Sequence, residues 1–270
     1  MALPAYGPSA CVRTWLRPGL AAAVMAVAIG SLTLGPGRCR AAEAEPESSL
    51  RLLYGNGFDD TYYELNTADE QIVSLVGRHW RSWDYGDSYV WLGVYVGSFV
   101  EVDDPSDRRG RVESYAAWWP RLSLSRATKK DLSWGPIADV YVAAELATGL
   151  GFDSASIGLS LDFRAPGFTY LGMAVYRRDD SLTSPVAQAT FWWVRPFRAG
   201  PTTITTEGYI YAAGSEDVGT DFFSLVQVVT DIGVFMGQPA NRFHAGIEWY
   251  YHDHRDQTVS LPQAILKWDW

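Results

Sequence analysis

Aromatic and acidic side chains recur at alternate positions along this 270-residue chain. Asp139, Tyr141 and Glu145 share one parity of the sequence, and Tyr209 and Tyr211 do the same further on. Flat aromatic rings stack on planar groups, and carboxylates accept hydrogen bonds from hydroxyl groups. The chemistry that these residue types offer together is stacking and hydrogen bonding of a small ligand.

Sequence motifs for catalysis or phosphate binding are absent. The chain has no G-x-S-x-G motif, no H-E-x-x-H motif and no phosphate loop, so we expect neither an enzyme nor a cofactor. A Ser–His triad stays open as an alternative, because the members of such a triad come together in space rather than in sequence.

One short stretch resembles a metal-binding pair. His252-Asp253-His254 places two imidazoles at positions i and i+2, which share one face of a strand. No third ligand is visible nearby in the sequence, and Arg255 and Asp256 follow directly. We therefore expect a solvated loop or turn here and no metal site.

The first 44 residues have the pattern of a secretory signal peptide. Arg13 and Arg17 precede an apolar run over residues 20–34, and Ala42-Glu43-Ala44 offers the small residues of a cleavage site. The run is short for a membrane-spanning helix, which needs about 20 residues, so a retained anchor is the weaker alternative. We expect export of the chain and removal of residues 1–44, with a cut after Ala41 as a variant.

Charge and cysteine content exclude further classes of protein. The net charge of −9 argues against nucleic acid as a partner, because that affinity comes mostly from Lys and Arg side chains that neutralise phosphates. With 47% hydrophobic and 20% charged residues, the chain has the composition of a folded protein. Cys11 and Cys39 both lie in the predicted signal peptide, so no disulfide is expected in the mature chain.

Alternation of apolar and polar residues predicts strands throughout the mature chain. Residues 154–163 alternate strictly, and the same period recurs over residues 139–146, 203–212 and 243–252. Turn-rich breaks separate about twelve such runs, so each run has room for one membrane crossing of about 9–11 residues and a connection. Residues 45–270 are therefore expected to form one all-β domain.

Alternation alone fits both a soluble periplasmic barrel or sandwich and a transmembrane barrel, whose inner and outer faces have opposite polarity. Two features favour the membrane. The apolar faces end in Trp and Tyr, as aromatic girdles require, and the chain ends on a strand with Ala264, Leu266, Trp268 and Trp270 on one parity. We expect a transmembrane antiparallel β-barrel of about 12 strands that the C-terminal strand closes.

Six short stretches carry a resemblance to a known family. They are Trp83-Asp84-Tyr85-Gly86-Asp87, Pro120-Arg121-Leu122-Ser123-Leu124, Lys130-Asp131-Leu132-Ser133-Trp134-Gly135-Pro136, Tyr176-Arg177-Arg178-Asp179, Gly246-Ile247-Glu248-Trp249 and Pro262-Gln263-Ala264. On these residues the chain resembles the Tsx family of nucleoside-specific outer-membrane channels, particularly its OmpK-like branch. The resemblance implies a monomeric twelve-stranded barrel that passes nucleosides by facilitated diffusion. Ala117 and Trp119 stand where relatives tend to carry acidic side chains.

The predicted lumen face supplies the groups that such a channel needs. Rings on this face would stack on a base, and its carboxylates would bind ribose hydroxyls. The candidate residues are Arg121, Asp139, Tyr141, Glu145, Tyr170, Tyr176, Trp192, Glu207, Tyr209, Tyr211, Glu248 and Tyr250. The alternative for any one of them is a structural role in the wall, as an ion-paired or space-filling residue.

The expected function is facilitated diffusion of nucleosides and similar small solutes into the periplasm. The expected partners are the transported nucleosides, the lipid bilayer and the outer-membrane assembly machinery. Two other functions remain possible. The barrel could be a non-transporting structural protein or a receptor for phage or other partners, or it could be a soluble periplasmic binding barrel. A channel conducts ions, whereas a non-transporting barrel gives no conductance. A membrane barrel needs detergent to stay in solution, whereas a soluble barrel does not.

Overall fold

The computed structural model describes residues 48–101, 106–215, 219–254 and 257–270. The predicted signal peptide lies outside these residues. Within the described ranges the chain is almost entirely strand, apart from the short helix α2 (Leu124–Thr128) and the 3-10 helix η1 (Gly233–Met236). None of the helices in these ranges is long and apolar enough to span a membrane.

Twelve long strands and one two-residue strand form the wall in the described residues. Their bounds are β1 (Ser48–Asn56), β2 (Asp59–Asp60), β3 (Leu65–Trp83), β4 (Gly86–Val100), β5 (Arg108–Ser123), β6 (Ile137–Gly149), β7 (Phe152–Phe163), β8 (Tyr170–Asp180), β9 (Val186–Ala199), β10 (Thr202–Ser215), β11 (Gly219–Asp231), β12 (Phe243–His254) and β13 (Gln257–Asp269). Each long strand pairs antiparallel with its neighbours in the chain.

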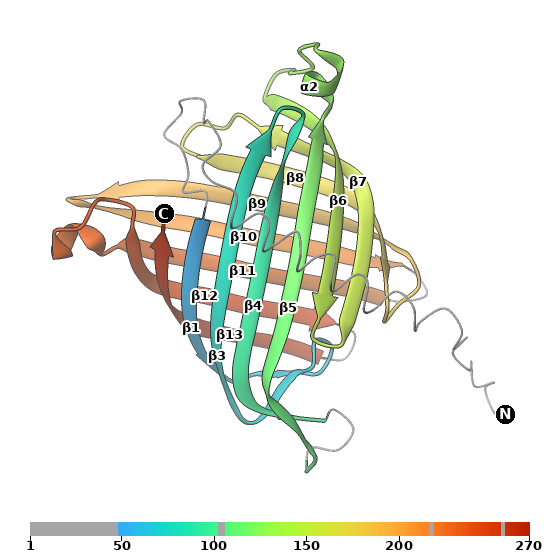
Figure 1. Cartoon of the computed structure of the whole chain (residues 1–270), viewed down its shortest axis with the longest axis vertical. Coiled ribbons are helices and arrows are strands. Elements are labelled where there is room, and N and C mark those ends of the chain that lie inside the picture. The colour runs from blue at the N-terminus through green and yellow to red at the C-terminus, as the bar shows by residue number, and fades with distance from the viewer. Residues whose placement is uncertain (1–47, 102–105, 216–218, 255–256) are drawn as a thin grey trace.

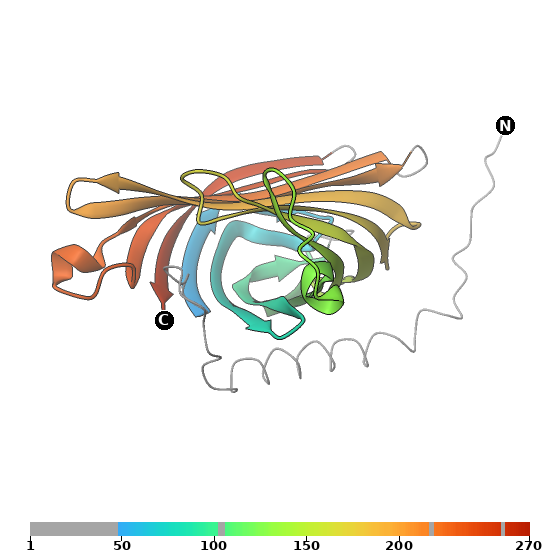
Figure 2. The ribbon, with the colours of Figure 1, turned by 90° about the horizontal axis from the view of Figure 1, so that it is seen from above.

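The barrel closes between its first and last strands. Leu52 of β1 pairs with Leu75 of β3 on one side and with Leu266 of β13 on the other. The predicted closed barrel, with twelve long strands and a closing C-terminal strand, is therefore confirmed. The wall is flattened and strongly tilted, so that β9–β12 at the back cross β3–β6 at the front at a steep angle (Figures 1 and 2).

The two ends of the barrel differ in what they carry. Helix α2 lies at one end together with Ser48 and Trp270, whose backbones are hydrogen-bonded to each other at 3.2 and 3.0 Å. We call this the α2 end. The opposite end carries β2 and the segment of residues 57–64 between β1 and β3, and we call it the β2 end.

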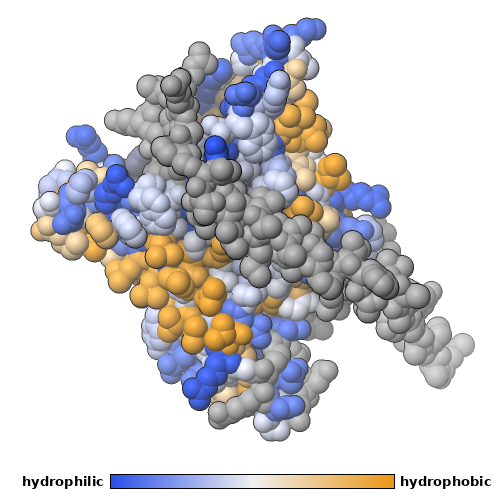
Figure 3. Space-filling view, in the orientation of Figure 1, coloured by the Kyte–Doolittle hydropathy of each residue, from blue (hydrophilic) through white to orange (hydrophobic). Residues whose placement is uncertain are grey.

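The outer face of the wall is apolar and the inner face is largely polar. On β7 the side chains of Ile157 and Leu159 are 62% and 57% exposed, whereas those of Ser156 and Ser160 are buried. Apolar surface gathers around the middle of the wall in Figure 3, and the ends of the molecule are mostly hydrophilic. This polarity is that of a barrel in lipid, and it is the reverse of what a soluble barrel would have.

A charge on the outer face is expected to destabilise the inserted barrel. Leu159→Arg should lower the free energy of unfolding by about 2–4 kcal/mol, the cost of an arginine near the bilayer midplane. Leu159→Met keeps the position apolar and should change stability little. Urea titration of the barrel folded into vesicles measures both variants. Equal stability of the arginine and methionine variants would contradict a lipid contact at Leu159.

Candidate functional site

All of the wall residues predicted from the alternation lie on the inward face of their strands. One group of them surrounds Arg121 near the α2 end. The guanidinium of Arg121 donates to Asp87 at 2.7 and 2.8 Å and to Asp162 at 2.7 and 3.2 Å. It also lies over the ring of Tyr141, 4.2 Å from the ring centroid. Arg121 therefore links β4, β5 and β7 and covers the face of Tyr141.

A second group surrounds Glu207 on β10. Its carboxylate forms ion pairs with Arg51, with Arg78 at 3.6 Å and with Lys267 at 3.3 Å. Arg51 is on β1, so this contact joins strands far apart in the wall. Removing one partner from a buried ion pair typically costs about 3–5 kcal/mol, so we assign Glu207 a structural role in the wall.

The middle of the lumen has a different chemistry, because amide groups bind the carboxylates there. Gln188 donates to Glu145 at 3.2 Å, and Gln263 donates to Glu248 at 3.0 Å. Gln227 also donates to Glu248. A carboxylate offers about four acceptor sites, so each of these groups can accept further hydrogen bonds from a ligand.

Part-exposed aromatic residues lie around Glu145. The side chain of Trp119 is hydrogen-bonded to the Glu145 carboxylate. The rings of Trp119 and Tyr209 lie 6.5 Å apart, centroid to centroid. Because all these side chains point inward, the solvent that reaches them is in the lumen.

The predicted aromatic residues divide by exposure. Tyr170, Trp192 and Tyr209 are part-exposed in the lumen, whereas Tyr141, Tyr176, Tyr211 and Tyr250 are buried. The buried tyrosines therefore have little ring surface open to a ligand, whereas the part-exposed rings keep some.

Several inward aromatic residues were not predicted. They are Tyr89 and Trp91 on β4 and Tyr115 and Trp119 on β5, all part-exposed. The signal was present on β5, because Tyr115 and Trp119 share the parity of Arg121. On β4 the signal was present as well, because Tyr89 and Trp91 share the parity of Asp87.

The segment of residues 57–64 folds into the lumen at the β2 end. Phe58 and Tyr63 are buried there, and the Tyr63 ring packs against Phe152 and Phe223 at centroid distances of 5.6 and 5.7 Å. The Tyr62 hydroxyl accepts a hydrogen bond from Arg178 at 3.2 Å. Burial raises the pKa of both tyrosine hydroxyls, so they are neutral in this contact. The segment narrows the lumen with apolar packing.

Removing side chains from this segment is expected to widen the lumen. Phe58→Ala combined with Tyr63→Ala should raise single-channel conductance severalfold in planar bilayers, because it removes two rings from the narrowed part. Tyr54→Ala is the matched control, since Tyr54 lies on the outer face and is 48% exposed. Unchanged conductance in a folded double variant would show that the narrowing lies elsewhere.

The prediction of a solvated loop at His252 and His254 is wrong. Both residues belong to β12, face the lumen and are buried, at 2% and 8% exposure. Their burial arises from Asp60 and Tyr62, which come from the segment of residues 57–64 and were invisible to local pattern. The structure also brings Asp221 of β11 next to both histidines.

Comparison with known proteins identifies related sequences. Residues 55–189, half of the chain, match the profile of a family described as "Nucleoside-specific channel-forming protein, Tsx". Over 123 residues the chain is 32% identical to the outer membrane protein OmpK of Vibrio parahaemolyticus, covering 43% of this chain and 47% of the relative. It is 22% identical over 138 residues to the OmpK of V. parahaemolyticus serotype O3:K6 (strain RIMD 2210633), covering 46% and 51%. The chain thus spans about half the length of these relatives.

A similar solved structure is the KdgM porin in complex with disordered oligogalacturonate. The TM-score is 0.46 at 8% sequence identity, and the match covers 83% of this chain and 98% of the porin.

Proposed function

Because the chain belongs to the Tsx family of nucleoside-specific channel-forming proteins, we propose that it is an outer-membrane channel for facilitated diffusion of nucleosides and similar small solutes. The observation that carries this proposal is in the middle of the lumen. There the rings of Trp119 and Tyr209, both part-exposed, lie beside the buried carboxylate of Glu145.

These groups match the two halves of a nucleoside. The base is flat, and stacking on an aromatic side chain contributes about 1–3 kcal/mol when a base binds to protein. The ribose carries hydroxyl donors, and Glu145 keeps acceptor sites beyond the bond from Gln188. A sugar without a base could use the carboxylate and would gain less from the rings.

Two carboxylates in the middle of the lumen support nucleosides over nucleotides. Glu145 and Glu248 lie in its middle and are bound by amide groups. Phosphate groups would meet these carboxylates at close range, in a narrow channel that strengthens electrostatic effects. Neutral nucleosides avoid this repulsion.

Export and insertion belong to the same proposal. We infer that residues 1–44 are a cleaved signal peptide and that the outer-membrane assembly machinery inserts residues 45–270 as a monomer into the lipid bilayer. The apolar outer face and the exposed Trp268 and Trp270 near the α2 end suit this placement, since indole rings favour the membrane interface.

A non-transporting barrel is the second candidate, and one observation favours it. Phe58 and Tyr63 pack with Phe152 and Phe223 inside the β2 end, as side chains that close the lumen would do. A structural or receptor protein would carry no current through such a barrel.

Single-channel recording in planar bilayers tests both candidates. The proposed channel is expected to give small conductance that adenosine and thymidine block and that a disaccharide of similar size blocks much less. Conductance without discrimination would leave only a general porin. Absence of current in correctly folded protein would favour the non-transporting barrel.

A further inference from the structure

We propose that Asp221, His252 and His254 form a binding site for one divalent transition-metal ion of the Zn²⁺, Ni²⁺ or Cu²⁺ type. One ligand atom from each residue lies within 4.8 Å of the others, and all three side chains are buried. Imidazole nitrogen and carboxylate oxygen are the donors that these ions accept in proteins. In a tetrahedral zinc site such donors lie about 3.3 Å apart, so small rotations would close the set around an ion.

The first support for the proposal is the group that orients His252. Its Nδ1 is 2.7 Å from Oδ2 of Asp60, a carboxylate with no exposed surface. Asp60 also accepts the Tyr250 hydroxyl at 2.5 Å and the backbone N–H of Tyr62 at 3.1 Å. Histidines that bind metals usually donate their second ring nitrogen to a carboxylate in this way. The contact directs Nε2 of His252 toward Oδ1 of Asp221, 3.1 Å away.

The second support is the arrangement of the Asp221 carboxylate. Its Oδ2 accepts hydrogen bonds from Arg178 at 3.1 Å and from the Tyr211 hydroxyl at 3.0 Å, and the same hydroxyl is 3.3 Å from Oδ1. These bonds fix the carboxylate, and they leave Oδ1 facing His252. The protein thus orients both oxygens, and Oδ1 lies on the side of His252, where an ion would bind.

The charge around the site suits a divalent cation despite the nearby guanidinium. Arg178 also pairs with Asp180 at 2.9 Å, so its charge is shared between two carboxylates. Three negative charges, those of Asp60, Asp180 and Asp221, thus face the single positive charge of Arg178. The excess is two negative charges when the imidazoles are neutral. An ion of charge 2+ would balance this excess in a buried place, where unbalanced charge is costly.

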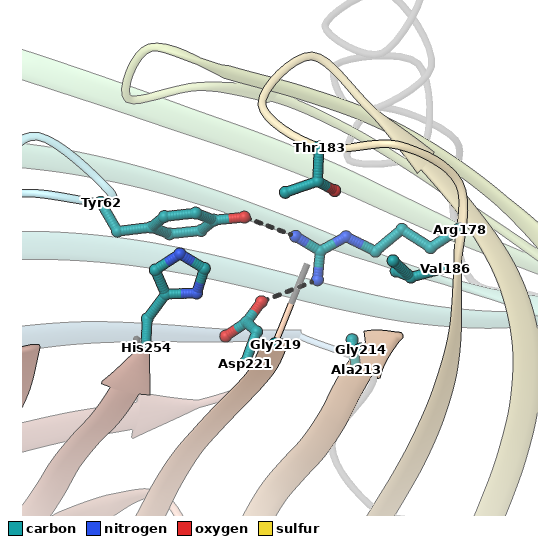
Figure 4. A pocket seen from close by; sticks show the side chains of 9 residues that line it. All are labelled: Tyr62, Arg178, Thr183, Val186, Ala213, Gly214, Gly219, Asp221 and His254. Atoms are coloured by element: carbon teal, nitrogen blue, oxygen red, sulfur yellow. Dashed lines mark hydrogen bonds and ion pairs between the residues drawn. The ribbon is translucent and has the colours of Figure 1, made fainter. Parts of the chain in front are cut away.

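The third support is space beside His254. A cavity of about 10 Å³ lies among Tyr62, Arg178, Asp221 and His254, which is the room for about one water molecule. Figure 4 shows Asp221 between Arg178 and His254, with the Tyr62 ring lying against the His254 ring at a centroid distance of 3.9 Å. Gly214 and Gly219 border the same cavity.

The competing interpretation is a hydrogen-bonded link in which His252 joins Asp60 to Asp221. That link needs one histidine only. In that link His254 packs against the Tyr62 ring and binds no ion. The two interpretations differ in whether His254 takes part, and this difference can be measured.

The test is metal titration of the untagged protein extracted from outer membranes. Calorimetry is expected to show one Zn²⁺ bound per barrel, with Ni²⁺ and Cu²⁺ competing and with Mg²⁺ silent, since Mg²⁺ prefers oxygen ligands and keeps its waters. Electron paramagnetic resonance of the Cu²⁺ complex should show coupling to two imidazole nitrogens. His254→Gln should reduce this to one nitrogen, and it is the decisive variant.

Two further variants complete the test. Asp60→Asn should lower the affinity for Zn²⁺ about 10–100-fold, as loss of an orienting carboxylate does. His244→Gln is the matched control, because His244 is also buried in β12 and lies 3.1 Å from a carboxylate, that of Asp269 near the α2 end. It should leave the affinity unchanged.

The proposal is overturned if the wild-type barrel binds no Zn²⁺ or if His254→Gln keeps full affinity. Should His254→Gln fail to fold, the Cu²⁺ spectrum of the wild-type protein decides alone, since a spectrum without two imidazole nitrogens contradicts the site. Neither result depends on nucleoside transport, so the metal site and the proposed channel function stand or fall separately.

Discussion

Deletion of residues 268–270 is expected to abolish assembly of the folded barrel in the outer membrane. The lost residues pair with β1, where Trp268 is opposite Leu50 and Asp269 is opposite Ser49. The backbone of Trp270 also exchanges hydrogen bonds with Ser48. Without these partners, backbone donors and acceptors at the closing seam would meet hydrocarbon, at several kcal/mol for each group.

The loss of assembly is measured by the yield of folded protein in the outer membrane and by the heat-dependent shift in gel mobility. The truncated chain should lack the faster-migrating band that a folded barrel gives before heating. Trp268→Phe combined with Trp270→Phe is the control, because it keeps the backbone pairing and an aromatic side chain at each position; it should fold. A normal yield of folded truncated protein would contradict closure of the barrel by β13.

The wall of the barrel could be predicted from the sequence because each strand separates two media. On β7 the lipid face needs Ile157 and Leu159, and the lumen face accepts Ser156 and Ser160, so the local pattern carries the fold. By the same logic the candidate residues are expected on the lumen face, where the structure has them, and their contact with a substrate stays a prediction. Membership of a family of channels also confirms the expectation that the chain is not an enzyme.

The contacts across the lumen could not be predicted in the same way. Arg51 and Glu207 are 156 positions apart, and their pairing depends on the tilt and the flattened section of the barrel. No period in the sequence contains this information. The same holds for Asp60 and His252, which are 192 positions apart. The local sequence therefore predicts a solvated histidine pair, whereas the segment of residues 57–64 covers it in the structure.

Arg121 and Tyr141 show how such contacts decide the roles of single residues. The sequence predicts that a ligand stacks on Tyr141, but the guanidinium of Arg121 lies over this ring, 4.2 Å from the ring centroid. That face is already used in a cation–π contact, so its loss would affect the position of Arg121 before it affected a ligand. Tyr209 and Trp119 are the better choice for a test of stacking.

Tyr209→Ala combined with Trp119→Ala is expected to weaken block of the channel by nucleosides about tenfold or more. One stacking contact of about 1.4 kcal/mol already corresponds to a factor of ten in affinity. The measurement is the concentration of adenosine or thymidine that halves the single-channel current. Small-ion conductance should rise or stay level, because two rings leave the lumen.

Trp249→Ala and a disaccharide provide the controls for this prediction. Trp249 is an indole on the outer face, 47% exposed, so its removal should leave nucleoside block unchanged. If the rings act only as filler, the double variant widens the lumen and weakens block by the disaccharide in parallel with block by the nucleosides. Stacking, in contrast, must affect the nucleosides and spare the sugar, because only the nucleosides carry a flat base. A parallel loss for all three solutes would therefore contradict nucleoside recognition by Trp119 and Tyr209 and leave the lumen as a general pore.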